Sequence, residues 1–308
     1  MSARGRLGHP ALEAGLGEPD AAPPGLDALL ARLETVLAQI GRVVVAFSGG
    51  ADSAFLACVA SRALGPGQAL CVTAVSPSLA AGEELHCRAL AAEWELRWQT
   101  VETAEMTDPR YVANGADRCA RCKDSLMAAL APVAAAESAT VVLGVNTDDL
   151  GDFRPGQAAA AAAGARFPLV EAGLAKSDVR ALSERLGLRT WNRPAGACLA
   201  SRLPYGTPVT VPTLRAVDAA ESGLRALGLR EFRVRHHGAV ARVEVAEREL
   251  VLVWSRRAEV VAAVKAAGYD VVSLDLEGFR SGSLNRLLGS TPPAIDSAPV
   301  RAGDLPAR

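Results

Sequence analysis

Short apolar runs alternate with segments of helical periodicity along the first two thirds of the chain. The runs at 43–47, 69–75 and 141–145 have the length of buried strands, and a further strand is predicted at 96–101. Helices are predicted around them, at 26–40, 53–64, 80–94, 122–136, 158–163 and 176–186. Buried strands that alternate with helices form parallel sheets covered on both faces, so this region predicts an α/β fold.

The pattern changes after about residue 203. Pro204, Pro208 and Pro212 mark a linker, and two alternating runs that meet at Gly238 predict a β-hairpin. The predicted elements are a helix at 214–227, the hairpin strands at 231–237 and 240–245, helices at 246–254 and 258–267, and a strand at 270–274. We expect a disordered leader at 1–24, a parallel-sheet domain at 25–203, a smaller α+β domain at 204–289 and a disordered tail at 290–308.

Composition and charge exclude several classes of protein. Half of the 308 residues (50%) are hydrophobic, which excludes global disorder. The balance of 33 basic and 34 acidic residues argues against a nucleic-acid partner. No apolar stretch is as long as a membrane span, so we expect a cytoplasmic protein without a membrane partner. We also expect a homo-oligomer.

The first predicted strand runs directly into Ser48-Gly49-Gly50-Ala51-Asp52-Ser53, and a helix follows. Glycines permit a tight turn close to a ligand, and the amides at a helix start bind anions. The hydroxyls of Ser48 and Ser53 add donors, whereas Asp52 suits an anion site only if a cation such as Mg²⁺ is also present. The loop therefore predicts a site for a phosphate chain with magnesium, and the alternative is a simple glycine turn with an N-cap.

The six cysteines fall into two groups. A disulfide framework is not expected in a cytosolic chain of this size. Cys58 and Cys71 lie in apolar runs and are predicted to be core residues, and Cys87 receives no role. Cys119 and Cys122 form a CxxC pair, which is typical of a redox pair, of half of a zinc site or of two cluster ligands. The alternative is that they are two cysteines without a chemical role at the start of a helix.

Cys198 lies in a stretch that is bounded by prolines and contains Arg193 and Arg202. Positive charge lowers the pKa of a thiol and so produces a nucleophilic thiolate. Both arginines are candidates for that charge. The alternative is a buried cysteine at a domain junction.

The hairpin strand at 231–237 carries basic residues on one face. Arg233, Arg235 and His237 alternate with Phe232 and Val234, and successive side chains of a strand point to opposite faces. The arginine fork suits carboxylates and phosphates. We therefore expect a pocket for a small anionic nucleotide, although an ordinary solvated strand face is the alternative.

Taken together, these motifs resemble a known family. SGGADS at 48–53 is similar to the PP-loop of the ATP pyrophosphatases. The further segments DRCARCK at 117–123, GVNTDDLGDFRPG at 144–156, GLAKSDVRALSERLGL at 173–188, CLASRLPYG at 198–206, VRHHGAVARVEV at 234–245 and DLEGFRSGSLN at 275–285 resemble the LarE family, the ATP-dependent sulfur transferases of nickel-pincer nucleotide synthesis. The resemblance covers roughly residues 26–288.

The resemblance implies ATP and Mg²⁺ as cofactors and a pyridinium dicarboxylate mononucleotide as substrate. It assigns ATP binding to Ser48, Gly49, Gly50, Asp52, Ser53, Gly144 and Lys176, with Asp52 also on Mg²⁺. It assigns sulfur transfer to Cys198 and places Ser201 and Arg202 beside it, and the basic strand adds Arg233 and Arg235 as substrate ligands. One substrate carboxylate would be adenylylated and then converted to a thiocarboxylate.

Two sulfur sources are compatible with these residues. The sulfur of Cys198 can be sacrificed, which leaves dehydroalanine on the protein. Alternatively, Cys119, Cys122 and Cys198 hold a [4Fe–4S] cluster that carries exogenous sulfide, and this is our hypothesis. Other readings of the chain are a tRNA thiolase or an amidating ligase on the same fold, or a nucleotide-binding module without activity.

Overall fold

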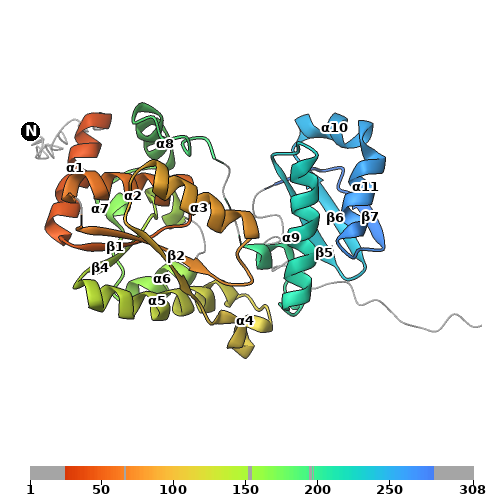
Figure 1. The fold of residues 1–308 in the computed structure, drawn as a ribbon, viewed down its shortest axis with the longest axis horizontal. Helices are drawn as coiled ribbons and strands as arrows, with labels where there is room; N and C mark the ends of the chain where they lie inside the picture. Colours follow the sequence, from red (N-terminus) through yellow and green to blue (C-terminus); the bar gives the residue numbers. More distant parts are fainter. Residues whose placement is uncertain (1–24, 66, 152–154, 194–195, 197, 281–308) are drawn as a thin grey trace, which may run out of the picture.

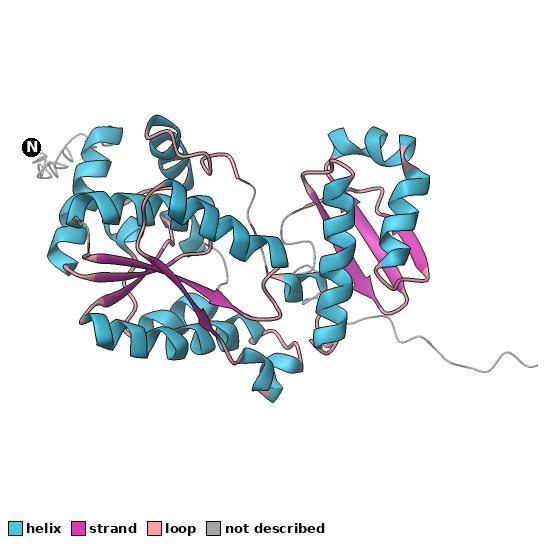
Figure 2. Ribbon diagram, viewed as in Figure 1, coloured by secondary structure: helices cyan, strands magenta, loops and turns pink. Residues whose placement is uncertain are grey.

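Two separate sheets organise the chain, as Figure 1 and Figure 2 show. The computed structural model describes residues 25–65, 67–151, 155–193, 196 and 198–280. A parallel sheet of four strands has the order β3-β2-β1-β4, and a sheet of three strands has the order β5-β6-β7. The predicted α/β class with a parallel sheet is confirmed. The predicted leader at 1–24 and the predicted tail at 290–308 lie outside the described residues. The domain boundary at 203 stays a prediction.

The strands are β1 (Val43–Ala46), β2 (Ala69–Val75), β3 (Trp98–Glu102), β4 (Thr140–Leu143), β5 (Phe232–His237), β6 (Val240–Val245) and β7 (Val271–Leu274). The helices are α1 (Leu26–Ile40), α2 (Ala51–Leu64), α3 (Ala81–Glu93), α4 (Pro109–Val112), α5 (Arg118–Glu137), α6 (Pro155–Ala162), α7 (Pro168–Glu171), α8 (Lys176–Arg185), α9 (Val211–Ala226), α10 (Leu250–Ser255) and α11 (Arg257–Ala266). Short 3-10 helices are η1 (Glu105–Thr107), η2 (Thr147–Gly151), η3 (Leu199–Arg202) and η4 (Glu247–Glu249). None of the described helices has the length and apolar character needed to cross a membrane.

The parallel sheet is buried between two layers of helices. Val43 and Val45 of β1 pack in the core cluster that includes residues of α1, α2, α3 and α8, whereas Val44 packs on the other face with Leu130 of α5. Fully burying an aliphatic side chain contributes about 1.5–3 kcal/mol relative to leaving it exposed. The continuous apolar run of β1 is therefore explained by burial on both faces.

The order of the parallel sheet reverses beside β1. The chain passes from β1 to β2 and β3 on one side and returns to place β4 on the other side of β1. In open α/β sheets, ligands bind outside the carboxyl ends of the strands at such a reversal. The loop after β1 carries the serine–glycine motif, and Gly144 follows β4, so both lie at this edge.

The smaller sheet is a hairpin with one added strand. β5 and β6 are antiparallel, with Phe232 opposite Val245, and Gly238 has a φ of 63° in the connection, as the predicted hairpin requires. β7 joins β6 in parallel, after a crossover through α10 and α11. Phe232 and Val234 pack with residues of α9 and α11 in one core cluster.

Several helix boundaries differ from the prediction, among them the starts of α6 (Pro155 and not residue 158) and α9 (Val211 and not residue 214). α2 begins at Ala51 and not at residue 53, so Asp52 lies in its first turn. α5 begins at Arg118 and not at residue 122, and the buried Arg118 donates hydrogen bonds to Asn114 Oδ1 (2.5 Å) and Ala200 O (2.9 Å). The predicted helix at 246–254 is divided into η4 and α10, where the Glu249 carboxylate accepts from the amides of residues 230 and 231. Tertiary hydrogen bonds, which local sequence does not specify, set the last two boundaries.

The close approach of β4 to the first turn of α2 generates a prediction. A methyl group at Gly144 would lie 2.7 Å from Ser53 N and 2.9 Å from Asp52 C, which are backbone atoms that cannot rotate away. We expect Gly144→Ala to lower the free energy of unfolding by about 1–3 kcal/mol, measured by urea denaturation. Gly82→Ala in α3 is the control, because nothing lies within 4 Å of its added methyl group. Equal urea midpoints for the two variants would contradict the packing.

Candidate active site

The serine–glycine loop is closed by its own hydroxyls. Ser53 Oγ lies 3.0 Å from Ser48 Oγ, accepts from Ser48 N at 3.2 Å and donates to Gly50 O at 3.2 Å. Gly49 has a φ of 67°, a left-handed conformation that favours glycine. The first amides of α2 have no acceptor within the helix, so this turn can bind an anion.

Asp52 is the centre of a polar group at the same edge of the sheet. It forms an ion pair with Lys176 Nζ, and its Oδ1 accepts from Asn146 Nδ2 at 3.3 Å. Lys176 begins α8, and its backbone amide donates to Asp148 Oδ2 at 2.9 Å. The structure thus brings together Asp52 and Lys176, which are separated by 124 positions. Asn146 and Asp148 were not predicted, although both lie in the family segment at 144–156.

Cys198 lies immediately before η3 and is half-buried. Leu199 N donates to Ser78 O at 2.9 Å, which attaches η3 to the segment after β2. Arg202 Nη1 donates to Cys198 O and to Ser201 Oγ, both at 3.0 Å. The predicted neighbours Ser201 and Arg202 therefore do lie beside Cys198.

The CxxC pair lies on the first turns of α5. Cys119 is exposed, while Cys122 is half-buried and packs, like Cys198, against the apolar cluster that includes Tyr111. Burial, together with the charge of Cys198, raises the pKa of Cys122 to about 12. The structure thus places Cys122 and Cys198 close to each other. Among the described residues, no three His, Cys, Asp or Glu side chains are grouped so that they could hold one metal ion.

Two polar atoms beside these cysteines lack partners within the described part of the chain. They are the hydroxyl of Tyr111 and Oε2 of Glu105, and both are buried. The other carboxylate oxygen of Glu105 accepts from Ser78 Oγ at 2.9 Å. Burial and then the charge of Cys198 raise the pKa of Tyr111, so the hydroxyl keeps its proton at neutral pH. Nothing in the sequence marked Tyr111 or Glu105.

The predicted basic face is buried at Arg235, half-buried at Arg233 and exposed at His237. Arg235 donates to Glu244 Oε2 at 3.0 Å and to Ser201 O at 2.9 Å, and Arg202 makes a bidentate pair with Glu221 at 2.9 and 3.0 Å. Arg235 of this face therefore packs on η3, while His237 at the end of the strand is solvated.

Arg233 adds positive charge to the same junction. It donates to Phe232 O at 2.8 Å and lies over the ring of Phe279 at 4.9 Å. Burial, followed by the charge of Arg202, lowers the pKa of Arg233 to about 10, so it stays charged at neutral pH. The junction gathers arginines around two buried carboxylates: Glu221 pairs with Arg202 and Arg225, and Glu244 pairs with Arg235 and Arg242.

Arg193 differs from its predicted place. Its guanidinium donates to Gly49 O at 2.9 Å and to both oxygens of Glu83 at 2.8 Å. Its charge is therefore held at the serine–glycine loop and not beside the thiol of Cys198. Of the two predicted arginines, only Arg202 contacts residue 198. Cys58, Cys71 and Cys87 are buried, as a core role requires.

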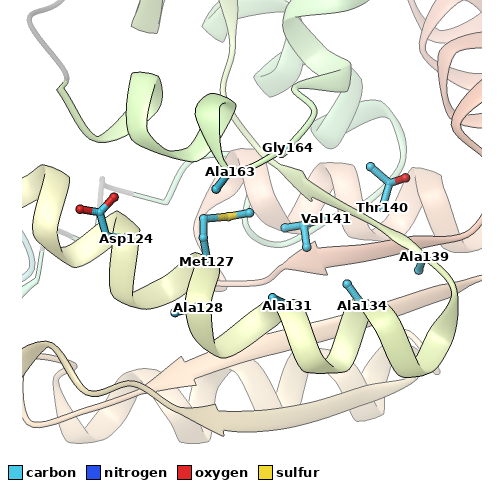
Figure 3. A pocket seen from close by; sticks show the side chains of 10 residues that line it. All are labelled: Asp124, Met127, Ala128, Ala131, Ala134, Ala139, Thr140, Val141, Ala163 and Gly164. Atoms are coloured by element: carbon cyan, nitrogen blue, oxygen red, sulfur yellow. The ribbon is translucent and has the colours of Figure 1, made fainter.

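A hollow of about 540 Å³ lies elsewhere, along α5, the start of β4 and the end of α6. Figure 3 shows that alanine side chains and Met127 form much of its wall. Asp124 is the single charged residue in its lining, and none of the predicted site residues lines it. It lies toward the amino end of β4, away from the edge where Asp52 and Gly144 meet, so we assign it no role in the site.

Comparisons with known proteins agree with this arrangement. The NAD synthase family matches residues 27–120, which contain the serine–glycine loop. An uncharacterized protein of Synechocystis is 42% identical over 267 residues, which are 85% of this chain and 99% of that protein. An uncharacterized protein of Methanocaldococcus jannaschii is 24% identical over 78% of this chain and 91% of its own length.

A characterised relative carries a function in its name. The pyridinium-3,5-bisthiocarboxylic acid mononucleotide synthase of Lactiplantibacillus plantarum is 38% identical over 261 residues, which cover 84% of this chain and 94% of the synthase. The chain therefore belongs to the LarE family of PP-loop enzymes, as its motifs predicted.

Proposed function

We propose that this chain is an ATP-dependent sulfur transferase that converts a carboxylate of pyridinium-3,5-dicarboxylate mononucleotide to a thiocarboxylate. The observation that carries the proposal is the convergence of a phosphate loop, Cys198 and a positively charged junction at one side of the parallel sheet. The synthase from Lactiplantibacillus plantarum supports the choice of substrate through its name. We further propose a cytoplasmic homo-oligomer.

The nucleotide half of the reaction uses the loop after β1. The amides and hydroxyls at Ser48–Ser53 bind the phosphates, and Asp52 with Asn146 offers the oxygen ligands that Mg²⁺ prefers. Lys176, now paired with Asp52, is within reach of the same loop and would accompany the pyrophosphate that leaves. A substrate carboxylate attacks the α-phosphorus of ATP, the bond to the β-phosphate breaks, and an acyl-adenylate and pyrophosphate form.

The substrate half uses the junction between the sheets. A mononucleotide with two carboxylates is an anion that needs several positive partners, and Arg202, Arg233 and Arg235 bring positive charge to this junction. Arg202 and Arg235 also hold Ser201 in place through its hydroxyl and its carbonyl. The acyl group of the adenylate would therefore be bound next to Cys198, where sulfur must attack it.

Cys119, Cys122 and Cys198 are proposed to hold the [4Fe–4S] cluster. Cys122 and Cys198 pack against the same apolar cluster and Cys119 lies one helical turn before Cys122, so a cluster would have to draw the three thiols together from positions in which they do not form a ligand set. Burial opposes ionisation of Cys122 unless a cation compensates its charge. A bound cluster with three cysteine ligands and one open iron would supply sulfide to the acyl-adenylate.

The alternative uses the sulfur of Cys198 itself. Its thiolate would attack the acyl carbon, AMP would leave, and a thioester would form. Removal of the Cα proton of Cys198 would then break the Cβ–Sγ bond, which releases the thiocarboxylate and leaves dehydroalanine. This route consumes one protein chain for each sulfur transferred.

The substrate site generates a prediction about Arg233. We expect Arg233→Met to raise the Kd of the pyridinium nucleotide at least about tenfold, because a hydrogen bond to a charged group contributes about 1.5–3 kcal/mol. The Kd of ATP should stay within about twofold of the wild-type value, and isothermal titration calorimetry measures both. Arg248→Met, which removes an exposed ion pair with Glu231, is the control and should change neither. An equal loss of both affinities would contradict the assignment.

The cluster generates a prediction about metal content. After anaerobic reconstitution with iron and sulfide, we expect the wild type to retain both and to absorb visible light. Cys119→Ser should lose most of this iron, while Cys87→Ser, which alters a buried cysteine of α3, should retain it. Iron bound equally by both variants would exclude the proposed ligands.

The two sulfur sources differ in the mass of the protein. We expect the intact mass of the reconstituted enzyme to be unchanged after several turnovers with ATP, sulfide and the pyridinium nucleotide. A loss of one sulfur with its hydrogens, located at Cys198 by peptide mass spectrometry, would instead assign the sulfur to that residue. Cys198→Ser should form no thiocarboxylate in either case.

A further inference from the structure

Glu83 of α3 lies between the phosphate loop and the segment that carries Cys198. Arg193 holds both carboxylate oxygens of Glu83 at 2.8 Å through Nη2, while its Nη1 donates to Gly49 O at 2.9 Å. A methyl group at Gly196 would lie 3.9 Å from Glu83 Oε2, so this glycine packs on the same carboxylate. Cys198 follows only two positions later.

The contact with Gly49 O has a geometric consequence for the phosphate loop. A trans peptide is planar, and its C=O and N–H point in opposite directions. Arg193, by holding the carbonyl of Gly49, therefore turns the N–H of Gly50 away from the guanidinium. Gly49 is also enclosed, because an added methyl group would meet His86 at 2.9 Å and Cys87 at 3.0 Å. The orientation of this peptide is thus fixed by α3 and Arg193 together.

A second ion pair of the same type lies nearby but lacks these contacts. Arg189 Nε pairs with Glu93, also on α3, at 2.6 Å, and about half of each side chain is exposed (46% and 45%). The side chains of Arg193 and Glu83 are less exposed (23% and 26%), and their pair alone touches the phosphate loop. An ion pair between exposed residues contributes about 0–1 kcal/mol to stability. The two pairs therefore differ mainly in what they contact, since the Arg193–Glu83 pair contacts the phosphate loop and the Arg189–Glu93 pair does not.

We propose that the Arg193–Glu83 pair is a tether that couples the phosphate loop to the Cys198 segment, which makes Arg193 a positioning residue for sulfur transfer. The inference rests on the proposed function. Arg193 acts through Gly49 and through Glu83, whose carboxylate faces Gly196 two positions before Cys198, and it takes no part in bond breaking. A misplacement of about 1 Å at a reacting group can reduce a rate about 100-fold, so the tether matters most for the step in which sulfur meets the acyl-adenylate.

The first test compares two products of one reaction. We expect Arg193→Met to slow thiocarboxylate formation at least about tenfold more than it slows pyrophosphate release, because water then hydrolyses the waiting acyl-adenylate to carboxylate and AMP. The ratio of pyrophosphate to thiocarboxylate therefore rises, and Arg189→Met should leave it unchanged. If both products fall by the same factor in Arg193→Met, the tether is refuted. Should Arg193→Met fail to fold, Glu83→Gln decides in the same assay, and we expect a smaller rise of the ratio.

The second test does not use the pyridinium nucleotide. In the metal-free full chain, AMP should change the rate at which iodoacetamide alkylates Cys198, followed by peptide mass spectrometry. Arg193→Met should abolish this effect of AMP while it still binds AMP, and Arg189→Met should retain the effect. An effect of AMP that persists in Arg193→Met, or that is missing in the wild type, would overturn the tether. If the wild-type protein releases no pyrophosphate with the pyridinium nucleotide, the proposed function is refuted. The alkylation experiment still tests the tether in that case, because it does not use the pyridinium nucleotide.

Discussion

The buried ion pair between Arg202 and Glu221 fixes Cys198 relative to the smaller sheet. Arg202 belongs to η3 and also holds the carbonyl of Cys198, while Glu221 belongs to α9 and accepts from the amide of Val234 in β5. Charges removed from water need several hydrogen bonds to offset their desolvation, and breaking such a pair costs about 3–5 kcal/mol. The segment that carries Cys198 is thus held by the Arg202 guanidinium, and Glu221 links that guanidinium to α9 and β5.

The same junction shows how a nearly neutral chain can concentrate positive charge in one place. The net charge of −1 describes the whole sequence, whereas the junction gathers three arginines around two buried carboxylates. Glu221 holds Arg202 and Glu244 holds Arg235, so the positive charge of the junction is kept in fixed positions. Low dielectric surroundings strengthen the attraction between this charge and a bound carboxylate.

Much of the fold was predictable because burial leaves a periodic trace in the sequence. The apolar run at 43–47 predicted β1, and the helix at 26–40 was predicted at both ends. The boundaries that differed depend on distant partners, such as the contact of Arg118 with Ala200. Contacts were predictable where the residues are close in sequence, as for Cys198 with Ser201 and Arg202, whereas the roles of the site residues stay predictions. Glu83, Asn146, Tyr111 and Glu105 were missed because each acts through residues far away in the sequence.

The sequence by itself determined the class of fold, the loop for a phosphate chain and the family, because each is written in short segments of residues with fixed spacing. Only the tertiary structure decided which charge meets which partner. Arg193 and Arg202 flank the same cysteine in sequence, yet Arg193 contacts Gly49, which is 144 positions away, and Arg202 contacts Glu221. A guanidinium binds whichever oxygens the packing of helices and sheets brings within about 3 Å, and spacing along the chain carries no record of that distance.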